Sequence, residues 1–269
     1  KMNGLGNDFV VVEARSAPFA PTPEQVRAIA DVATGVGFDQ LIAIDKGVDG
    51  ADASVRFWTA DGEEVSACGN GTRCVGWLLM QANDSDRTVI DTRAGRLIAT
   101  RAGDRLVSVD MGEPGLSWAD IPLAFEQDTQ ALETSLTEEP ALAAAPGCVS
   151  MGNPHVVFFV DDIATAPVAT AGPAIERHPL FPDKVNVGFA QILDRDHIRL
   201  RVWERGAGLT LACGTGACAA LVAAARRDLT DRSAVLKLDG GDLLIEWRAE
   251  DNHVIMTGPA AVDFAGELP

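Results

Sequence analysis

The chain has 269 residues, of which 47% are hydrophobic, enough for one large globular domain or two of medium size. Its formal net charge of −17 disfavours nucleic acid and anionic membrane surfaces as partners. Five cysteines, without the regular spacing of a secreted disulfide framework, indicate a reducing cytoplasm. No signal peptide and no membrane span is visible in the sequence.

The N-terminal half is predicted to contain short strands and two helices. Helical spacing of apolar residues covers 23–34, with Thr22 as the candidate N-cap and Pro23 in the first turn. A second helix is expected within 65–81, and it includes the first cysteine of interest, Cys68. Turn signals separate the expected strands, a pattern typical of an antiparallel sheet: 9–13, 39–45, 54–59, 88–91, 96–101 and 106–111.

A domain boundary is expected at Gly112–Gly115. We therefore predict an N-terminal domain over 1–114, an acidic connecting segment over 115–146 and a C-terminal domain over 147–269, whose last residues can pack back on the first domain. The elements expected in the second half follow the same kind of order: 156–160, a helix within 168–177, 185–192, 197–203, a helix after Cys213, 234–238, 243–247 and 253–257.

The helix after Cys213 is the most informative element. Cys213 precedes a Gly-Thr-Gly turn that leads into an apolar run, Ala219–Ala225. This run is too short to cross a membrane and is apolar around its whole circumference, so it is predicted to be a buried helix. At the N-terminus of such a helix, unpaired backbone N–H groups and the helix dipole favour a thiolate or a bound carboxylate.

The same motif occurs earlier in the chain, at Cys68, which precedes a Gly-Asn-Gly turn 145 residues before Cys213. Other segments recur in the same order at similar offsets: 56–58 with 201–203, 6–7 with 152–153, 95–98 with 241–244, and 36–40 with 187–191, the last at an offset of 151. Repeated self-similarity of this kind indicates a duplicated domain. We therefore predict an α+β fold of two pseudo-symmetric domains, each a curved, mostly antiparallel sheet or barrel around a central buried helix.

Duplication suggests a use for the two cysteines. If Cys68 and Cys213 met across a cleft, one thiolate could remove a proton from a carbon while the other thiol returned one to the opposite face. This inverts a stereocentre without a cofactor, and the Gly-Asn-Gly and Gly-Thr-Gly amides would bind the substrate carboxylate. Zinc binding is a poor fit to the cysteine spacing, and Cys74, Cys148 and Cys218 are interpreted as structural.

These motifs resemble the diaminopimelate epimerase family over essentially the whole chain. The segments that carry the resemblance are 1–9, 67–74, 152–155, 185–187, 202–206 and 212–216. The resemblance implies a cofactor-free isomerase that interconverts LL- and meso-diaminopimelate in lysine and peptidoglycan precursor synthesis, with Cys68 and Cys213 as the two bases. It also implies a small amino acid substrate, a cytoplasmic location and a homodimer, with no metal, nucleic acid or membrane partner.

The resemblance further implies a set of binding residues. The distal end of the substrate would be held by Asn7, Gln40, Thr59, Asn153, Asn186, Glu204 and Arg205, and the reacting end by Gly69, Asn70, Gly214 and Thr215. His155 and Glu204 would tune the two thiols. Two positions depart from the family pattern: Thr59 replaces the usual Asn, and Leu209 stands where many relatives have Glu.

Other interpretations remain open at this stage. Asn7 and Asn153 are repeat-equivalent, so both can be turn residues of the fold. A proline racemase or hydroxyproline epimerase has a similar duplicated plan with two cysteines, although Glu204-Arg205 and the Asn residues argue against a pocket of proline size. A thiol redox protein using a reversible Cys68–Cys213 disulfide is the alternative from another class.

Overall fold

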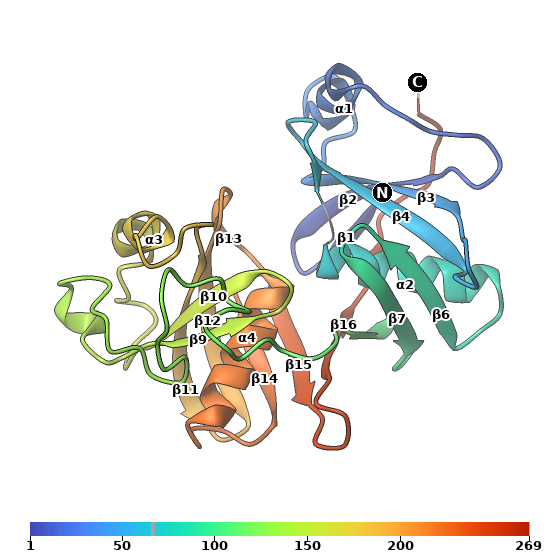
Figure 1. Cartoon of the computed structure of the whole chain (residues 1–269). Helices are drawn as coiled ribbons and strands as arrows, with labels where there is room; N and C mark the ends of the chain where they lie inside the picture. The colour runs from blue at the N-terminus through green and yellow to red at the C-terminus, as the bar shows by residue number, and fades with distance from the viewer. Residues whose placement is uncertain (66–67, 269) are drawn as a thin grey trace. The chain divides into compact units, whose positions relative to one another are not determined.

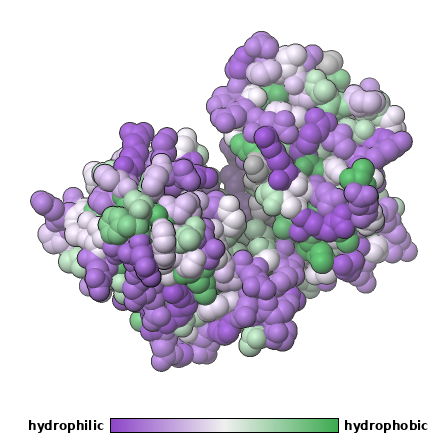
Figure 2. Space-filling view, viewed as in Figure 1, coloured by the Kyte–Doolittle hydropathy of each residue, from purple (hydrophilic) through white to green (hydrophobic). Residues whose placement is uncertain are grey.

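The computed structural model describes residues 1–65 and 68–268, and it divides into two compact units. The N-unit comprises Lys1–Asp110 and the chain from Thr257 onward, and the C-unit comprises Met111–Met256. Hydrophilic residues cover most of the visible face of each unit (Figure 2), as the strongly negative charge leads one to expect. Among the described residues, every helix is too short or too polar to span a bilayer.

The N-unit is a mixed sheet that packs around one long helix, α2 (Figure 1). Its strands pair antiparallel except for two parallel pairs, β2–β3 and β4–β6. The α2 helix is contacted by strands that precede it and strands that follow it in the chain: β1, β2, β3, β6, β7 and β8. In chain order the elements are β1 Met2–Gly4, β2 Asn7–Glu13, α1 Pro23–Ala30, β3 Gln40–Lys46, β4 Ala53–Thr59, β5 Glu64–Val65, α2 Gly69–Ala82, β6 Arg87–Thr92, β7 Gly95–Arg101, β8 Leu106–Asp110 and β17 Ala261–Val262.

The C-unit repeats this plan around α4 (Figure 1). The middle turns of α4 are fully buried. Strands β9, β10, β11, β12, β14 and β15 all contact this helix. Its elements are a 3₁₀ helix at Pro140–Leu142, β9 Gly147–Ser150, β10 Pro154–Phe159, α3 Val168–Glu176, β11 Asn186–Asp194, β12 His197–Glu204, β13 Gly208–Thr210, α4 Gly214–Arg226, β14 Ser233–Leu238, β15 Gly241–Trp247 and β16 Val254–Pro259. The boundary between the two units, at Met256 and Thr257, falls within β16.

The two units pair their strands in the same way. The antiparallel pairs β1–β2, β3–β4, β4–β5 and β6–β7 correspond to β9–β10, β11–β12, β12–β13 and β14–β15. The parallel pairs β2–β3 and β4–β6 correspond to β10–β11 and β12–β14. The predicted α+β fold, duplicated and built around two buried helices, is therefore confirmed.

The strand registers correct one of the sequence matches. Phe9 pairs with Gln40 in the N-unit, and His155, which lies 146 residues after Phe9, pairs with Asn186 in the C-unit. Gln40 therefore corresponds to Asn186, also at an offset of 146, and the match of 36–40 with 187–191 is wrong. A short shared string gave the wrong alignment, because hydrogen-bond register rather than local similarity fixes which residues are equivalent.

The predicted start of the first helix is confirmed, but its end is earlier than predicted. Thr22 caps α1 in a capping box with Gln25, and Pro23 occupies the first turn. The helix ends at Ala30 rather than Thr34, because the Asp31 carboxylate accepts hydrogen bonds from the backbone of Ala33 and Thr34 and so holds a turn.

The segment 115–146, predicted as an acidic connection, belongs to the C-unit and packs on its core. Its backbone is mostly irregular, but its leucine and isoleucine side chains are buried with those of α3 and β10: Ile121, Leu123, Leu132, Leu136 and Leu142. The Gly115 backbone also forms a bridge with Ser150 in β9. This acidic stretch thus packs as a covering layer of its unit through its apolar positions.

Candidate active site

Each unit presents a cysteine at the N-cap of its buried helix. Cys68 caps α2 and Cys213 caps α4, both with extended backbone. The Cys68 Sγ accepts a hydrogen bond from the Gly71 N–H at 3.4 Å, whereas the Cys213 Sγ lies 3.8 Å from the Thr215 hydroxyl. The prediction that both thiols stand at helix N-termini is therefore confirmed.

Close packing explains the second glycine of each Cys-Gly-x-Gly turn. A Cβ on Gly71 would lie 2.8 Å from Ile42 Cδ1, and a Cβ on Gly216 would lie 3.0 Å from Val202 Cγ2 and 3.1 Å from the Cys213 Sγ. Contacts this short force neighbouring atoms to move. The glycines let strands β3 and β12 approach the two helix N-termini, and this approach fixes the position of each sulfur.

The electrostatics of Cys213 differ from the expectation of a stabilised thiolate. Burial raises the pKa of the Cys213 thiol well above its usual value, and the nearby Glu204 carboxylate raises it further. Burial likewise raises the pKa of Glu204. The Gly216 N–H acts in the opposite direction but is the weaker effect. Desolvation therefore outweighs the helix N-terminus here, and the buried Cys213 and the half-buried Glu204 form a pair that can share a proton.

In the N-unit, the predicted residues Asn7 and Asn70 form a hydrogen-bonded pair. The Asn70 amide nitrogen donates to Asn7 Oδ1 at 2.6 Å, and Arg73 Nη1 donates to Asn70 Oδ1 at 2.9 Å. Arg73 has no solvent exposure. The sequence motifs alone did not single out this arginine, which lies two residues after the Cys-Gly-x-Gly turn; an arginine this early in a buried helix is the signal that marks it.

Gln40 and Thr59 lie directly opposite each other on β3 and β4. The Thr59 hydroxyl is used within its own turn, by Asp61 Oδ1 and the Glu63 carbonyl. The Gln40 Oε1 is buried and has no hydrogen-bond partner among the residues that the structure describes. A buried acceptor of this kind is the feature expected of a ligand-binding side chain. At this edge the structure thus favours Gln40 over Thr59 as a contact for a ligand.

In the C-unit, a line of hydrogen bonds connects His155 to the turn at Cys213. His155 Nε2 bonds to Asn153 Oδ1 at 3.1 Å, and the Asn153 amide nitrogen bonds to Thr215 Oγ1 at 3.3 Å. Burial and, to a smaller extent, the charge of Arg205 together lower the pKa of His155 to about 3. The imidazole is therefore neutral at pH 7, and its Nε2 carries the proton because Oδ1 can only accept.

Asn186 fixes the turn that carries Glu204 and Arg205. Its Oδ1 accepts from the Arg205 N–H at 2.9 Å, and its amide nitrogen donates to the Pro154 carbonyl at 2.9 Å. The Arg205 guanidinium is exposed and donates to the Asp183 carbonyl. The amide oxygen and the amide nitrogen of Asn186, a predicted substrate-binding residue, thus both bond to neighbouring backbone groups. These bonds position Arg205.

The predicted residues therefore form two groups, one in each unit. The N half-site consists of Asn7, Gln40, Thr59, Cys68, Gly69 and Asn70. The C half-site consists of Asn153, His155, Asn186, Glu204, Arg205, Cys213, Gly214 and Thr215. The units correspond residue by residue, since Asn7, Gln40, Thr59, Cys68 and Asn70 occupy the positions of Asn153, Asn186, Glu204, Cys213 and Thr215.

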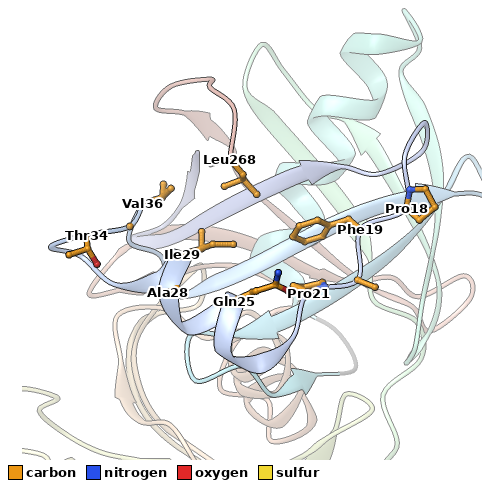
Figure 3. A pocket seen from close by; sticks show the side chains of 11 residues that line it. Pro18, Phe19, Pro21, Gln25, Ala28, Ile29, Thr34, Val36 and Leu268 are labelled. Atoms are coloured by element: carbon orange, nitrogen blue, oxygen red, sulfur yellow. The ribbon is translucent and has the colours of Figure 1, made fainter.

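The N-unit also contains a groove. Its volume is about 580 Å³, and it lies between α1, the preceding loop and the C-terminal segment, with Phe19, Ile29 and Leu268 among its lining residues (Figure 3). No half-site residue lines it. Within 1–65 and 68–268, no group of three His, Cys, Asp or Glu side chains is arranged to hold a metal ion.

Comparison with known proteins gives one consistent result. The model of the diaminopimelate epimerase family matches residues 1–117 and 147–262. The whole chain is 73% identical to the diaminopimelate epimerase of Phenylobacterium zucineum (strain HLK1) and 60% identical to that of Caulobacter vibrioides (strain NA1000 / CB15N), and it covers 96% of each.

Solved structures share the fold at low sequence identity. A phenazine biosynthesis protein of the PhzC/PhzF type from Clostridium difficile has a TM-score of 0.71 at 15% identity, with 100% of this chain and 97% of that chain covered. A hydroxyproline epimerase from Agrobacterium vitis, with bound trans-4-hydroxy-L-proline, has a TM-score of 0.65 at 15% identity, with 100% and 90% covered. At this identity the likeness concerns the fold alone.

Proposed function

Because this chain belongs to the diaminopimelate epimerase family, we propose that it interconverts LL- and meso-2,6-diaminopimelate without a cofactor, in lysine and peptidoglycan precursor synthesis. The observation that carries the proposal is the pair of cysteines at equivalent helix N-caps, Cys68 and Cys213. A nearly symmetric reaction suits two groups of one type, since each must act as base in one direction and acid in the other.

The proposed reaction is a proton exchange at one α-carbon. One cysteine, as thiolate, removes the α-proton, and the electron pair of the broken C–H bond passes into the substrate carboxylate. The other cysteine, as thiol, delivers its proton to the opposite face of the same carbon. The configuration is inverted and the two sulfurs exchange protonation states, so that protons and charge balance. N–H groups at the α2 and α4 N-termini stabilise the negative charge that develops on the carboxylate.

Glu204 supports this scheme by its position beside Cys213. The thiol pKa is raised by burial and by the carboxylate, so Cys213 is suited to the thiol form that donates a proton. When Cys213 acts as base, Glu204 can take up the thiol proton first. We assign Glu204 to tuning the pKa of the Cys213 thiol. We assign His155 to the same role through its hydrogen-bond line by way of Asn153 to Thr215.

Recognition of the second amino acid group is assigned to the remaining half-site residues. Gln40, Glu204 and Arg205 offer an acceptor, a carboxylate and a guanidinium, which suit an ammonium and a carboxylate group. Asn7 and Asn153 complete this set, Asn186 contributes by positioning Arg205, and Thr59 lies opposite Gln40 at the same edge. Gly69, Asn70, Gly214 and Thr215 are assigned to the reacting end. We include in the proposal a cytoplasmic location, a homodimer by family resemblance, and a duplication with repeats 1–114 and 147–269 joined by 115–146.

Hydrogen exchange in heavy water tests the proposal directly. The reduced protein is incubated with LL-diaminopimelate, and separately with L-proline, and deuterium at the α-carbon is measured by mass spectrometry. Incorporation into diaminopimelate is expected. Exchange in proline alone would instead favour a proline racemase, and exchange in neither substrate would leave the redox interpretation.

Cysteine variants test the two-base scheme separately from the substrate. Cys68→Ala and Cys213→Ala are each expected to abolish epimerisation while circular dichroism shows an intact fold. Cys148→Ala serves as a matched control, because Cys148 is fully buried and is not a half-site residue, so turnover should stay nearly unchanged. Near-normal turnover in either of the first two variants would rule out the scheme.

A further inference from the structure

A buried carboxylate outside the predicted site holds the turn that carries Glu204 and Arg205. Glu176 is the last residue of α3 and is only 3% exposed, within the apolar core of the C-unit. Its Oε2 accepts from the Trp203 indole Nε1–H at 2.8 Å, and its Oε1 accepts from the Gly206 backbone N–H at 3.2 Å. The two donors directly flank Glu204 and Arg205 in the chain, so one side chain secures both ends of this pair.

The sequence of α3 allows this arrangement. Gly172, one helical turn before Glu176, packs directly on Trp203: a Cβ at this position would lie 2.7 Å from the indole Cγ. The missing side chain lets α3 lie against β12 closely enough for Glu176 to reach both donors. Gly206 has a φ of +79°, a conformation that L side chains rarely adopt, so its N–H is presented by a turn that glycine makes accessible.

The two hydrogen bonds of Glu176 matter for the stability of the turn because the carboxylate is buried. A carboxylate that is removed from water needs hydrogen-bond donors, and charge-assisted hydrogen bonds are stronger than neutral ones. The turn is held independently at Arg205, whose N–H donates to Asn186. Glu176 thus holds the Trp203 indole and the Gly206 backbone, and Asn186 holds the Arg205 backbone between them, so the segment from Trp203 to Gly206 is held at three residues.

We propose that Glu176 is a positioning residue that sets the distal-end specificity of the enzyme by fixing the directions of Glu204 and Arg205. This inference rests on the proposed function, in which these two residues hold the amino acid group that does not react. In this role Glu176 acts through its bonds to Trp203 and Gly206. The N-unit places Thr59-Ala60 where the C-unit has Glu204-Arg205, so this positioning belongs to one half-site only.

Glu176→Gln is the most informative variant. It keeps the size of the side chain, but its amide NH₂ must face one of the two N–H donors, so one bond is lost. Loss of one partner of a buried hydrogen bond changes binding by about tenfold. We expect KM for diaminopimelate to rise about tenfold with a smaller change in kcat, and the Trp203 indole ¹H–¹⁵N resonance to shift. Glu246→Gln, an exposed glutamate on β15, is the matched control.

A double variant tests the bridge itself. Trp203→Phe removes one donor, so in this background the glutamine NH₂ need no longer oppose an N–H. The effect of Glu176→Gln on KM should therefore be smaller in Trp203→Phe than in the wild type. Equal effects in both backgrounds would overturn the bridging role.

A truncated substrate separates positioning from general stability. L-2-Aminopimelate lacks the distal amino group, so the ratio of wild-type to Glu176→Gln kcat/KM should be smaller for it than for diaminopimelate. A lower melting temperature with unchanged KM, or an equal ratio for both substrates, would overturn the inference. If the wild-type protein itself does not exchange the α-proton of diaminopimelate, the proposed function fails instead, and the two failures are distinguishable.

Discussion

Arg73 donates a hydrogen bond to Asn70 Oδ1 at 2.9 Å from a fully buried position on α2. Since this bond occupies the Asn70 oxygen, the amide nitrogen is the end that faces Asn7 Oδ1, at 2.6 Å. The buried guanidinium thus determines which way the amide of a half-site residue points. Arg73 also donates weakly to the Pro259 carbonyl at 3.4 Å, which connects α2 to the last part of the chain.

We therefore predict that Arg73→Lys lowers kcat/KM for diaminopimelate about tenfold or more. Lysine keeps the charge but lacks the planar fork that reaches Asn70 and Pro259 together, and an unmet buried bond costs about 1–3 kcal/mol. Steady-state kinetics give the measurement, and Arg105→Lys, at an exposed position, is the control. Unchanged kinetics in a folded Arg73→Lys variant would show that Asn70 does not need this partner.

Gly216→Ala is expected to reduce kcat more than it reduces stability. The added methyl would lie 3.1 Å from the Cys213 Sγ and 3.0 Å from Val202 Cγ2, so the sulfur must move. A misplacement of about 1 Å can cost about 100-fold in rate, so the smaller shift here is expected to lower kcat by less than that. Turnover and the thermal midpoint are measured together, with Gly266→Ala as control because a Cβ there meets no atom within 4 Å. Full activity in Gly216→Ala would mean that the position of Cys213 tolerates this shift.

The low pKa of His155 predicts that the folded protein loses stability in acid. Burial and, to a smaller extent, the charge of Arg205 lower the pKa of this imidazole to about 3, against 6.5 for an ordinary histidine. The unfolded chain therefore binds a proton below pH 6.5 that the folded chain refuses until about pH 3. The stability from neutral His155 is complete above pH 6.5 and is lost as the pH falls toward 3, at up to about 1.4 kcal/mol per pH unit.

Urea unfolding at pH 6.5 and pH 5 measures this effect. His155→Gln cannot titrate in this range, so its stability should fall less than that of the wild type over the same interval, by about 2 kcal/mol. Identical pH dependence in both proteins would mean that His155 is protonated in the folded state near its ordinary pKa.

Alkylation should distinguish the cysteines. Cys68 is half-buried and accepts a hydrogen bond at a helix N-terminus, so iodoacetamide is expected to modify it first at pH 7.5. Burial raises the pKa of Cys74 to about 12, and Cys148 and Cys218 are fully buried, so these three should remain unmodified in the folded protein. Peptide mass spectrometry gives the order of labelling. Modification of Cys74 as fast as Cys68 would contradict this account of their reactivity.

Much of the fold could be predicted from local signals. Repeated motifs indicated two equivalent units, and the apolar run after Cys213 indicated a buried helix, because both depend on residues close together in the chain. Apolar spacing predicts that α1 extends to Thr34, but the helix ends at Ala30. The turn at Asp31 depends on side-chain hydrogen bonds that compete with the helix. The match of 36–40 with 187–191 failed because strand register is a long-range property.

The duplication, the two cysteine-capped helices and the family could all be inferred from the amino-acid sequence, since these reside in short motifs and their order. Four features became apparent only in the folded chain: the correspondence of Gln40 with Asn186, the bond by which Arg73 orients Asn70, the bridge from Glu176 to Trp203 and Gly206, and the raised pKa of the buried Cys213. Each of these depends on burial and on contacts between residues distant in the chain. Local sequence does not encode how much water a side chain loses or which donor it meets after folding.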